Sequence, residues 1–365
     1  MVNLWWEGKS NQFAKIKDSI KKNVNLFEEI NANSINKPTT VQKSSDKVVW
    51  RNKLFWADNL EVLYYLMKDF KEKIDLIYID PPFFSGTNYQ IKIEEKERFY
   101  ETIAYYDCWE KDLDSYLQML YERIILFKRL LSEKGLLFIH LDWHAIHYVK
   151  LILDEVFGQD KFVNNIIWYY YNKYSTGKKT IPRAHDDILV YSKSSNYELN
   201  EIRIPRNKPI KQLKREMVDG VLKNVKDKDG HVVYRTVKDK KLDDVWKIPC
   251  LQPASKEWTG FPTQKHHRLL ERIIRLGSNE GDLIADFFCG SGTTLLVAEK
   301  LKRKWIGSDI SEYAIYLTQK RLIEYQNKSS DSFNTFNIYT ILTEDREKLI
   351  NSGFFKKKLQ IERKR

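Results

Sequence analysis

Two segments of the chain combine residue types that could do chemistry. The first is Asp80-Pro81-Pro82-Phe83, which directly follows the apolar run Leu76 to Ile79. A carboxylate, two rigid prolines and an aromatic ring therefore stand where a buried strand is expected to end. A carboxylate at such a point serves either as an acceptor in catalysis or as a turn former that caps the next helix. The segment alone leaves both roles open.

The second segment has the layout of a nucleoside pocket. A strand end, a glycine turn and a helix start follow one another in Asp286-Phe287-Phe288-Cys289-Gly290-Ser291-Gly292-Thr293. The missing Cβ atoms of the glycines let a ligand approach the backbone. About twenty residues onward the next predicted strand ends in Asp309, followed by Ile310, and a carboxylate at that position holds ribose hydroxyls in α/β cofactor sites.

Motifs that the chain lacks narrow the choice of nucleoside. Leu295 stands where a dinucleotide-binding fingerprint has a glycine, and the Gly-Lys pair of a phosphate-binding loop is absent here. Without a device for pyrophosphate, the pocket favours a phosphate-free nucleoside, of which S-adenosylmethionine is the commonest. Taken alone, the glycine turn could equally be an ordinary tight connection between a strand and a helix.

Together the motifs resemble those of the β-class DNA amino-methyltransferases, which methylate the exocyclic amine of adenine or cytosine. The resemblance covers about Leu54 to Phe336. It rests on the tetrapeptide, on the glycine turn and on Phe261-Pro262-Thr263-Gln264-Lys265, which a helix follows. The order is also that of the β class: catalytic strand, variable basic region, cofactor motif. The chain departs from the family at Lys265-His266, where Lys-Pro is usual.

The resemblance implies a mechanism for the tetrapeptide. Asp80 and the carbonyl of Pro81 would accept the two N–H bonds of the amine, so that its lone pair can point at the sulfonium methyl group. Pro82 would help to fix the backbone, and Phe83 would stack on a base flipped out of the duplex. Asp in the first position is mostly associated with adenine N6 in this family, so adenine is favoured over cytosine N4.

The resemblance also implies cofactor contacts from four parts of the chain: Asp58-Asn59, Thr263-Gln264-Lys265, Asp286 to Thr293 and Asp309-Ile310. Asp58 and Asn59 are equally well explained as a plain helix start. The reaction needs no metal, and the histidines at 140, 144 and 147 are expected to be ordinary neighbours of the sheet. Nor is Cys250, after Pro249, expected to act as a covalent nucleophile.

Other classes of function stay open. An RNA or protein methyltransferase could share the tetrapeptide, but it would place the cofactor turn first. A catalytically inactive DNA-binding subunit would require damage to one of the two motifs, and both are intact. The resemblance leaves a homodimer and a partner restriction endonuclease open.

Alternating strands and helices must position these segments. Short apolar runs alternate with amphipathic segments, which predicts strand 54–56, helix 60–70, strand 74–79, helix 113–131, strand 135–141 and helix 145–157, with a second βα series over 283–342. The runs 165–171 and 187–192 are expected to pair as edge strands. We therefore predict an α/β fold: a Rossmann-like methyltransferase with one mostly parallel, seven-stranded sheet, circularly permuted motif order and an inserted target-recognition region.

Positive charge is concentrated between the two halves. The 365 residues carry a formal net charge of +12, and from Asn172 to Lys241 there are 18 Lys or Arg against 9 Asp or Glu. Such a cluster is either a solvated insertion or, more in keeping with its density, a contact surface for DNA phosphates. Double-stranded DNA is thus the expected partner. Asp229-Gly230 predicts a hairpin turn in this region.

The chain divides into five parts: a helical N-terminal arm (1–50, with helical spacing from Phe13 to Ile30), a catalytic half (51–192), a basic target-recognition region (193–258), a cofactor-binding half (259–345) and a basic tail (346–365). No stretch approaches the length of a membrane span. Cys108, Cys250 and Cys289 are spaced too widely for a zinc site or a disulfide framework, so a cytoplasmic location is expected.

Overall fold

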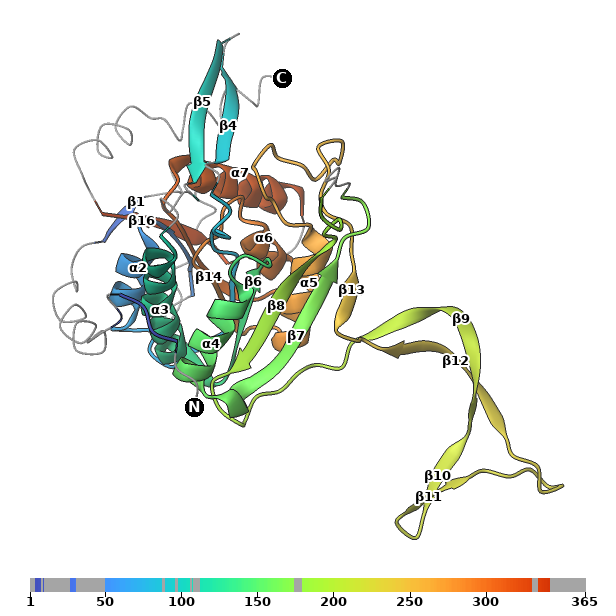
Figure 1. The fold of residues 1–365 in the computed structure, drawn as a ribbon. Helices are drawn as coiled ribbons and strands as arrows, with labels where there is room; N and C mark the ends of the chain where they lie inside the picture. The colour runs from blue at the N-terminus through green and yellow to red at the C-terminus, as the bar shows by residue number, and fades with distance from the viewer. Residues whose placement is uncertain are drawn as a thin grey trace, which may run out of the picture.

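The computed structural model describes residues 4–7, 9, 27–30, 50–86, 89–95, 98–105, 107, 112–173, 179–329 and 334–341. Its centre is a sheet of ten strands with helices on both faces (Figure 1). Across the sheet the strands are β1 (Glu28–Ile30), β16 (Phe336–Thr340), β2 (Asn52–Trp56), β15 (Lys304–Asp309), β14 (Leu283–Asp286), β3 (Ile74–Ile79), β6 (Leu131–Leu141), β8 (His185–Ser192), β7 (Phe162–Tyr169) and β13 (Val245–Lys247).

Most neighbouring strands run parallel. All neighbours from β16 to β6 are parallel, whereas β8 is antiparallel to both β6 and β7, and β1 is antiparallel to β16. Strands from both halves of the chain alternate, so β3 lies directly beside β14. Because parallel neighbours end at the same edge of a sheet, this pairing brings Asp80 and Asp286 together.

The sheet is larger than the seven strands predicted from the sequence. Two of the three additional strands, β1 and β13, extend its two ends, and each is only three residues long, too short for a periodic pattern to indicate it. β13 pairs with β7, so the run 165–171 is not at the edge as expected. Glu28–Ile30 is a strand rather than the end of a helix, because its backbone pairs with the open edge of β16. The remainder of the predicted arm helix and the tail 346–365 lie outside the described residues.

Two layers of helices cover the sheet (Figure 1). One layer is α2 (Asn59–Leu66), α3 (Leu113–Leu130) and α4 (Ile146–Phe157); the other is α5 (His267–Gly277), α6 (Thr293–Lys300) and α7 (Glu312–Lys328). Along β3, Ile77 and Ile79 pack in the first layer, and Leu76 and Tyr78 in the second. Burial on both faces explains why β3 is a continuous apolar run.

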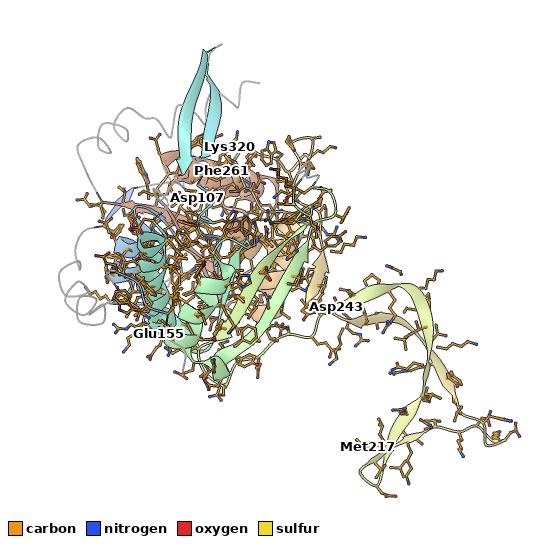
Figure 2. All side chains as sticks on the ribbon, viewed as in Figure 1. Asp107, Glu155, Met217, Asp243, Phe261 and Lys320 are labelled. Carbon is orange, nitrogen blue, oxygen red and sulfur yellow. The ribbon has the colours of Figure 1, made fainter. Side chains whose placement is uncertain are left out.

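Two antiparallel hairpins extend from this body (Figure 1). β4 (Tyr89–Glu95) and β5 (Arg98–Tyr105) follow the tetrapeptide. The basic region forms a long ribbon of β9 (Arg203–Leu213) and β12 (Tyr234–Lys241), continued by β10 (Arg215–Val218) and β11 (Val221–Asn224). Figure 2 shows Asp243 at its base and Met217 at its far end. The hairpin predicted at Asp229-Gly230 is confirmed by an antiparallel bridge between Lys226 and Val232.

Two further expectations can be compared with the described residues. Cys250 and Cys289 are free thiols, and Cys108 lies outside the part of the chain that the structure describes. Among the described helices, none has the length and apolar character that crossing a membrane requires.

Candidate active site

The tetrapeptide stands at the carboxyl end of β3, where prolines end the strand because they lack the N–H that a sheet ladder needs. Hydrogen bonds then fix the loop. The Tyr116 hydroxyl donates to the carbonyl of Pro82 at 2.7 Å, and the Asp107 carboxylate accepts from the N–H groups of Phe84 and Ser85, both at 2.9 Å. Phe84 has a φ of 62°, which non-glycine residues rarely adopt. The surrounding bonds therefore hold the loop in a strained conformation.

The two carboxylate oxygens of Asp80 have different surroundings. Oδ2 accepts a hydrogen bond from the ammonium group of Lys265, which lies 185 residues further along the chain. Oδ1 is buried and has no hydrogen-bond partner among the described residues, and Nδ1 of His140 is 3.5 Å from it. Buried acceptors in folded proteins are nearly always paired. Oδ1 is thus placed to accept a hydrogen bond from a group that a ligand brings.

The glycine turn joins β14 to α6. Gly290 and Gly292 have φ angles of 49° and 73°, and a Cβ atom on Gly292 would lie 2.5 Å from Oγ1 of Thr318 in α7. The hydroxyl of Thr318 donates to the carbonyl of Gly290 at 3.1 Å, and the N–H of Gly290 donates to Asp309 at 2.8 Å. α7 and the end of β15 therefore fix the shape of the turn.

Two buried carboxyl groups stand at the ends of the neighbouring strands β14 and β15. Burial raises the pKa of Asp286 to about 7, although hydrogen bonds from Thr294 and from the N–H of Phe288 oppose the increase. Burial likewise raises the pKa of Asp309 to about 6, against hydrogen bonds from backbone N–H groups. A positively charged ligand nearby would favour the ionised form of both. Burial also raises the pKa of the Cys289 thiol well above its usual value, so this cysteine is not an activated nucleophile.

Asp58 and Asn59 are held by a buried arginine. The guanidinium group of Arg123, in α3, donates to Asn59 and to both carboxylate oxygens of Asp58 at 3.0 and 3.3 Å. The amide of Asn59 donates in turn to the carbonyl of Phe287 at 2.8 Å. Asp58 also caps α2, since its side chain accepts from the N–H of Leu60. Asp58 therefore caps α2 and lines the cavity at the same time.

The segment before α5 is ordered by its own polar groups. The Gln264 amide donates to the carbonyl of Glu257 at 2.8 Å, and the Glu257 carboxylate accepts from the N–H of His267 at 2.7 Å. His266, where the family usually has proline, caps α5 by accepting from the N–H of Arg268. Glu257, His266 and His267 are close enough together to hold a metal ion, but in this structure they bind the backbone and one another. These bonds direct Lys265 toward Asp80.

The segments line one cavity of about 360 Å³. Nearly all the residues predicted for the site share it: Asp58, Asn59, Asp80, Pro81, Pro82, Phe83, Thr263, Gln264, Lys265, Asp286, Phe287, Phe288, Cys289, Gly290, Ser291, Thr293, Asp309 and Ile310. Gly292 is the exception, since it lies against Thr318 of α7 and not on the cavity wall. The other lining residues were not predicted from the sequence as site residues: Tyr78, Asp107, Met119, Arg123, Phe261, Leu270 and Thr294.

Some of these omissions had a signal in the sequence. Arg123 is a charged residue at a buried position of an amphipathic helix, which indicates a paired, functional or structural charge. Phe261 belongs to the motif quoted for the family resemblance. Asp107 has no such signal, because it comes after the β4–β5 hairpin and reaches the tetrapeptide loop only through the fold.

A doubly wound sheet with a cavity at the carboxyl ends of its parallel strands defines an α/β enzyme that binds a nucleoside-like ligand. The family model described as DNA methylase matches residues 74–320, which is more than half of the chain. The protein therefore belongs to the DNA methylase family.

Two relatives named as methyltransferases agree with this assignment. The chain is 30% identical to the DNA adenine methyltransferase YhdJ of Escherichia coli (strain K12) over 264 residues, covering 72% of this chain and 80% of the relative. It is 29% identical to the type II methyltransferase M.EcaI of Enterobacter cloacae over 339 residues, covering 78% and 72%. The solved structure of the M1.HpyAVI–SAM complex aligns with a TM-score of 0.49 at 22% identity, covering 74% of this chain and 98% of that one.

Proposed function

We propose that this protein transfers a methyl group from S-adenosylmethionine to the N6 amine of an adenine that is flipped out of double-stranded DNA. The observation that carries the proposal is Oδ1 of Asp80, a buried acceptor without a hydrogen-bond partner in the described part of the chain. Its residue lines the same cavity as the glycine turn. Oδ1 of Asp80 could therefore bind an amine donor, and the glycine turn a nucleoside cofactor, in the same cavity. The naming of the relative YhdJ as an adenine methyltransferase supports the choice of base.

The cavity suits S-adenosylmethionine by shape and by charge. Phe261, Phe287 and Leu270 offer apolar walls for an adenine ring, and the glycine turn admits a ligand close to the backbone. Asp309 would hold the ribose hydroxyls. Asp286 and Asp58 would compensate the ammonium and sulfonium charges. When bound, this cofactor supplies a methyl group on a positively charged sulfur.

The residues of the tetrapeptide then act on the base. The exocyclic amine is a poor nucleophile, because its lone pair is delocalised into the ring. Oδ1 of Asp80 would accept one N–H and the carbonyl of Pro81 the other, which frees the lone pair. The Phe83 ring would stack on the base; on the protein side, Nζ of Lys265 lies 5.2 Å and the His140 ring 5.5 Å from its centroid. Lys265 orients the carboxylate through Oδ2.

DNA is the macromolecular substrate in this proposal, and the basic ribbon would contact its phosphates. From Arg203 to Lys241 the ribbon has 13 Lys or Arg against 5 Asp or Glu, and most of these side chains are exposed. The relative StyLTI Mod subunit of Salmonella typhimurium is named as part of a type III restriction-modification enzyme, which supports a role in restriction and modification. An endonuclease partner and a homodimer stay predictions from the family resemblance.

The test is to incubate the protein with labelled S-adenosylmethionine and duplex DNA, and to identify the labelled nucleoside after digestion. N6-methyladenine is expected, whereas N4-methylcytosine would reassign the base, and label in transfer RNA alone would contradict DNA as the substrate. Asp80→Ala should abolish transfer but leave cofactor affinity within about threefold, since the carboxylate acts on the base. Asp160→Ala is the control, because that side chain is 73% exposed. Full transfer by Asp80→Ala would contradict the mechanism.

A further inference from the structure

A buried histidine connects the tetrapeptide to a second carboxylate. His140, in β6, has no exposed surface. Its Nδ1 atom lies 3.5 Å from Oδ1 of Asp80 and 3.1 Å from the hydroxyl oxygen of Tyr78, and its Nε2 atom lies 3.3 Å from Oδ2 of Asp186 in β8. The three neighbouring strands β3, β6 and β8 thus form a continuous line of carboxylate, imidazole and carboxylate that starts at the cavity.

The surroundings of Asp186 determine which imidazole nitrogen carries the proton. Burial alone would raise the pKa of Asp186, but the hydrogen bond and charge of His140, the charge of Lys265 and a hydrogen bond from Tyr170 outweigh it, and the pKa is lowered. Asp186 is therefore a carboxylate, which can only accept hydrogen bonds. Nε2 of His140 must donate to it, and in a neutral imidazole Nδ1 is then an acceptor.

This tautomer explains why Oδ1 of Asp80 has no hydrogen-bond partner among the residues that the structure describes. Oδ1 of Asp80 and Nδ1 of His140 lie 3.5 Å apart, and both are acceptors. Neither atom carries a hydrogen that it could donate to the other. Tyr78 donates its own hydroxyl hydrogen to Nδ1, and burial raises the pKa of this tyrosine well above its usual value, so it stays neutral. One additional proton can satisfy Oδ1 and Nδ1 together, provided that the hydroxyl of Tyr78 turns away, because Nδ1 has a single lone pair.

Methylation of an amine releases one such proton. As the N–C bond forms and the C–S bond breaks, sulfur keeps the bonding electron pair and nitrogen acquires a positive charge. The product becomes a neutral methylamine only when nitrogen loses a proton. Asp80 would accept a hydrogen bond from an N–H of that nitrogen, so it is the first base that can take this proton.

We propose that His140 takes up this proton through Asp80, with Asp186 stabilising the imidazolium, an inference that rests on the proposed function. The proton passes from the amine nitrogen to Oδ1 of Asp80 and then to Nδ1 of His140, whose charge lies between two carboxylates. It leaves by the same route after the product departs, because the side chain of Asp80 is 17% exposed whereas that of His140 is fully buried. His140 acts through Asp80, so it is a positioning residue rather than a catalytic one.

Several elements contribute charged groups near Asp80 and His140. Asp80 follows β3, Asp186 belongs to β8, and Lys265 approaches Asp80 from the segment before α5. Asp142, just after β6, adds negative charge near Asp186. Three carboxylates and one ammonium group are therefore the charged groups near His140 and its two carboxylate neighbours.

The tautomer is tested in the free protein by ¹⁵N NMR of the imidazole. His140 should carry its hydrogen on Nε2 at neutral pH, and Asp186→Asn should remove this preference and move protonation of His140 to lower pH. A neutral form protonated on Nδ1, or a titration that Asp186→Asn leaves unchanged, would overturn the proposal. This measurement requires neither cofactor nor DNA.

The role of His140 is tested by single-turnover methylation across pH. The wild-type rate should fall at low pH as His140 becomes protonated, and His140→Gln should be slower by about 10²-fold and lack this fall, since general base catalysis contributes at least that much. Cofactor affinity should not change. His147→Gln is the matched control, because His147 is exposed on α4 and is outside the cavity lining.

The possible failures are distinguishable. If the wild-type protein methylates no nucleic acid, the proposed function fails. If it methylates DNA and His140→Gln keeps the wild-type rate, or is slower with an unchanged pH profile, His140 does not relay the proton.

Discussion

The ammonium group of Lys265 donates a hydrogen bond to Oδ2 of Asp80 and so ties the segment before α5 to the end of β3. Both side chains are mostly buried, with 10% and 17% of their surfaces exposed. The same ammonium lies over the Phe83 ring at 5.2 Å. One residue of the segment before α5 thus positions two residues of the tetrapeptide Asp80 to Phe83.

Lys265→Met should therefore impair methyl transfer without removing any part of the tetrapeptide. A hydrogen bond to a charged group contributes about 1.5–3 kcal/mol, so the rate should fall by about 10- to 100-fold. Single-turnover rates at saturating cofactor measure this effect. Lys68→Met is the control, because Lys68 is exposed just beyond α2. A rate equal to that of the control would show that the contact does not position Asp80.

The raised pKa values of Asp286 and Asp309 predict opposite effects of pH on stability and on cofactor binding. With folded pKa values of about 7 and about 6, against an ordinary aspartate pKa of 3.8, both groups hold protons in the folded protein that the unfolded chain has released. The folded state binds more protons, so these groups make the free protein less stable as pH rises from about 4 to 7. A cationic cofactor favours the ionised groups, so its affinity should increase over pH 5.5 to 8.

Calorimetric titration and thermal unfolding across this pH range measure both trends. Asp286→Asn should raise the unfolding temperature at pH 8, weaken cofactor binding and flatten its pH dependence. Asp160→Asn, at an exposed position, should change neither. Cofactor affinity that is independent of pH in the wild-type protein would contradict the assignment of these carboxyls to the cofactor site.

The parts of the site that the sequence predicts are those with a local physical cause. Asp80 and Asp309 each follow an apolar run that must be a buried strand, and the glycine turn requires φ angles that only glycine adopts freely. Their neighbourhood in space follows from the parallel pairing of β3 with β14 and of β14 with β15. The order of motifs and the alternation of strands and helices were sufficient to predict that these strand ends lie close together.

Other features depend on packing between distant segments. Arg123 reaches Asp58 from α3, and Asp107 reaches the tetrapeptide loop after a hairpin, so no spacing in the sequence connects these pairs. His140 looked like an ordinary buried histidine, because nothing in its local sequence places Asp80 and Asp186 on either side of the ring. The three-residue strands β1 and β13 form because open sheet edges accept any extended backbone.

Gly292 permits a test of the glycine turn that separates steric exclusion from backbone strain. An alanine Cβ atom there would lie 2.5 to 2.8 Å from three side-chain atoms of Thr318, at a φ of 73°. Gly292→Ala should lower cofactor affinity by more than tenfold, because the turn must move. Gly220→Ala is matched, since Gly220 has a φ of 75° and open space around it. If both variants bind cofactor equally well, the turn does not shape the cofactor site.

The ribbon offers a test of DNA contact that leaves the cavity untouched. Lys208, Lys211 and Lys214 are exposed along β9 and just after it, far in the fold from the glycine turn (Figure 1). Each phosphate contact contributes about 0.9 to the slope of log affinity against log salt, so changing all three to glutamine should lower the slope by up to about 2.7. Cofactor affinity should stay the same.

The control for this variant neutralises three exposed lysines elsewhere, Lys68, Lys71 and Lys73, which follow α2. Both triple variants reduce the net charge equally, so a general electrostatic effect would weaken DNA binding to the same extent in each. A larger decrease in affinity and slope for the β9 variant would locate the phosphate contacts on the ribbon. Equal decreases would mean that long-range attraction by the total charge, and not contact by the ribbon, brings DNA to the protein.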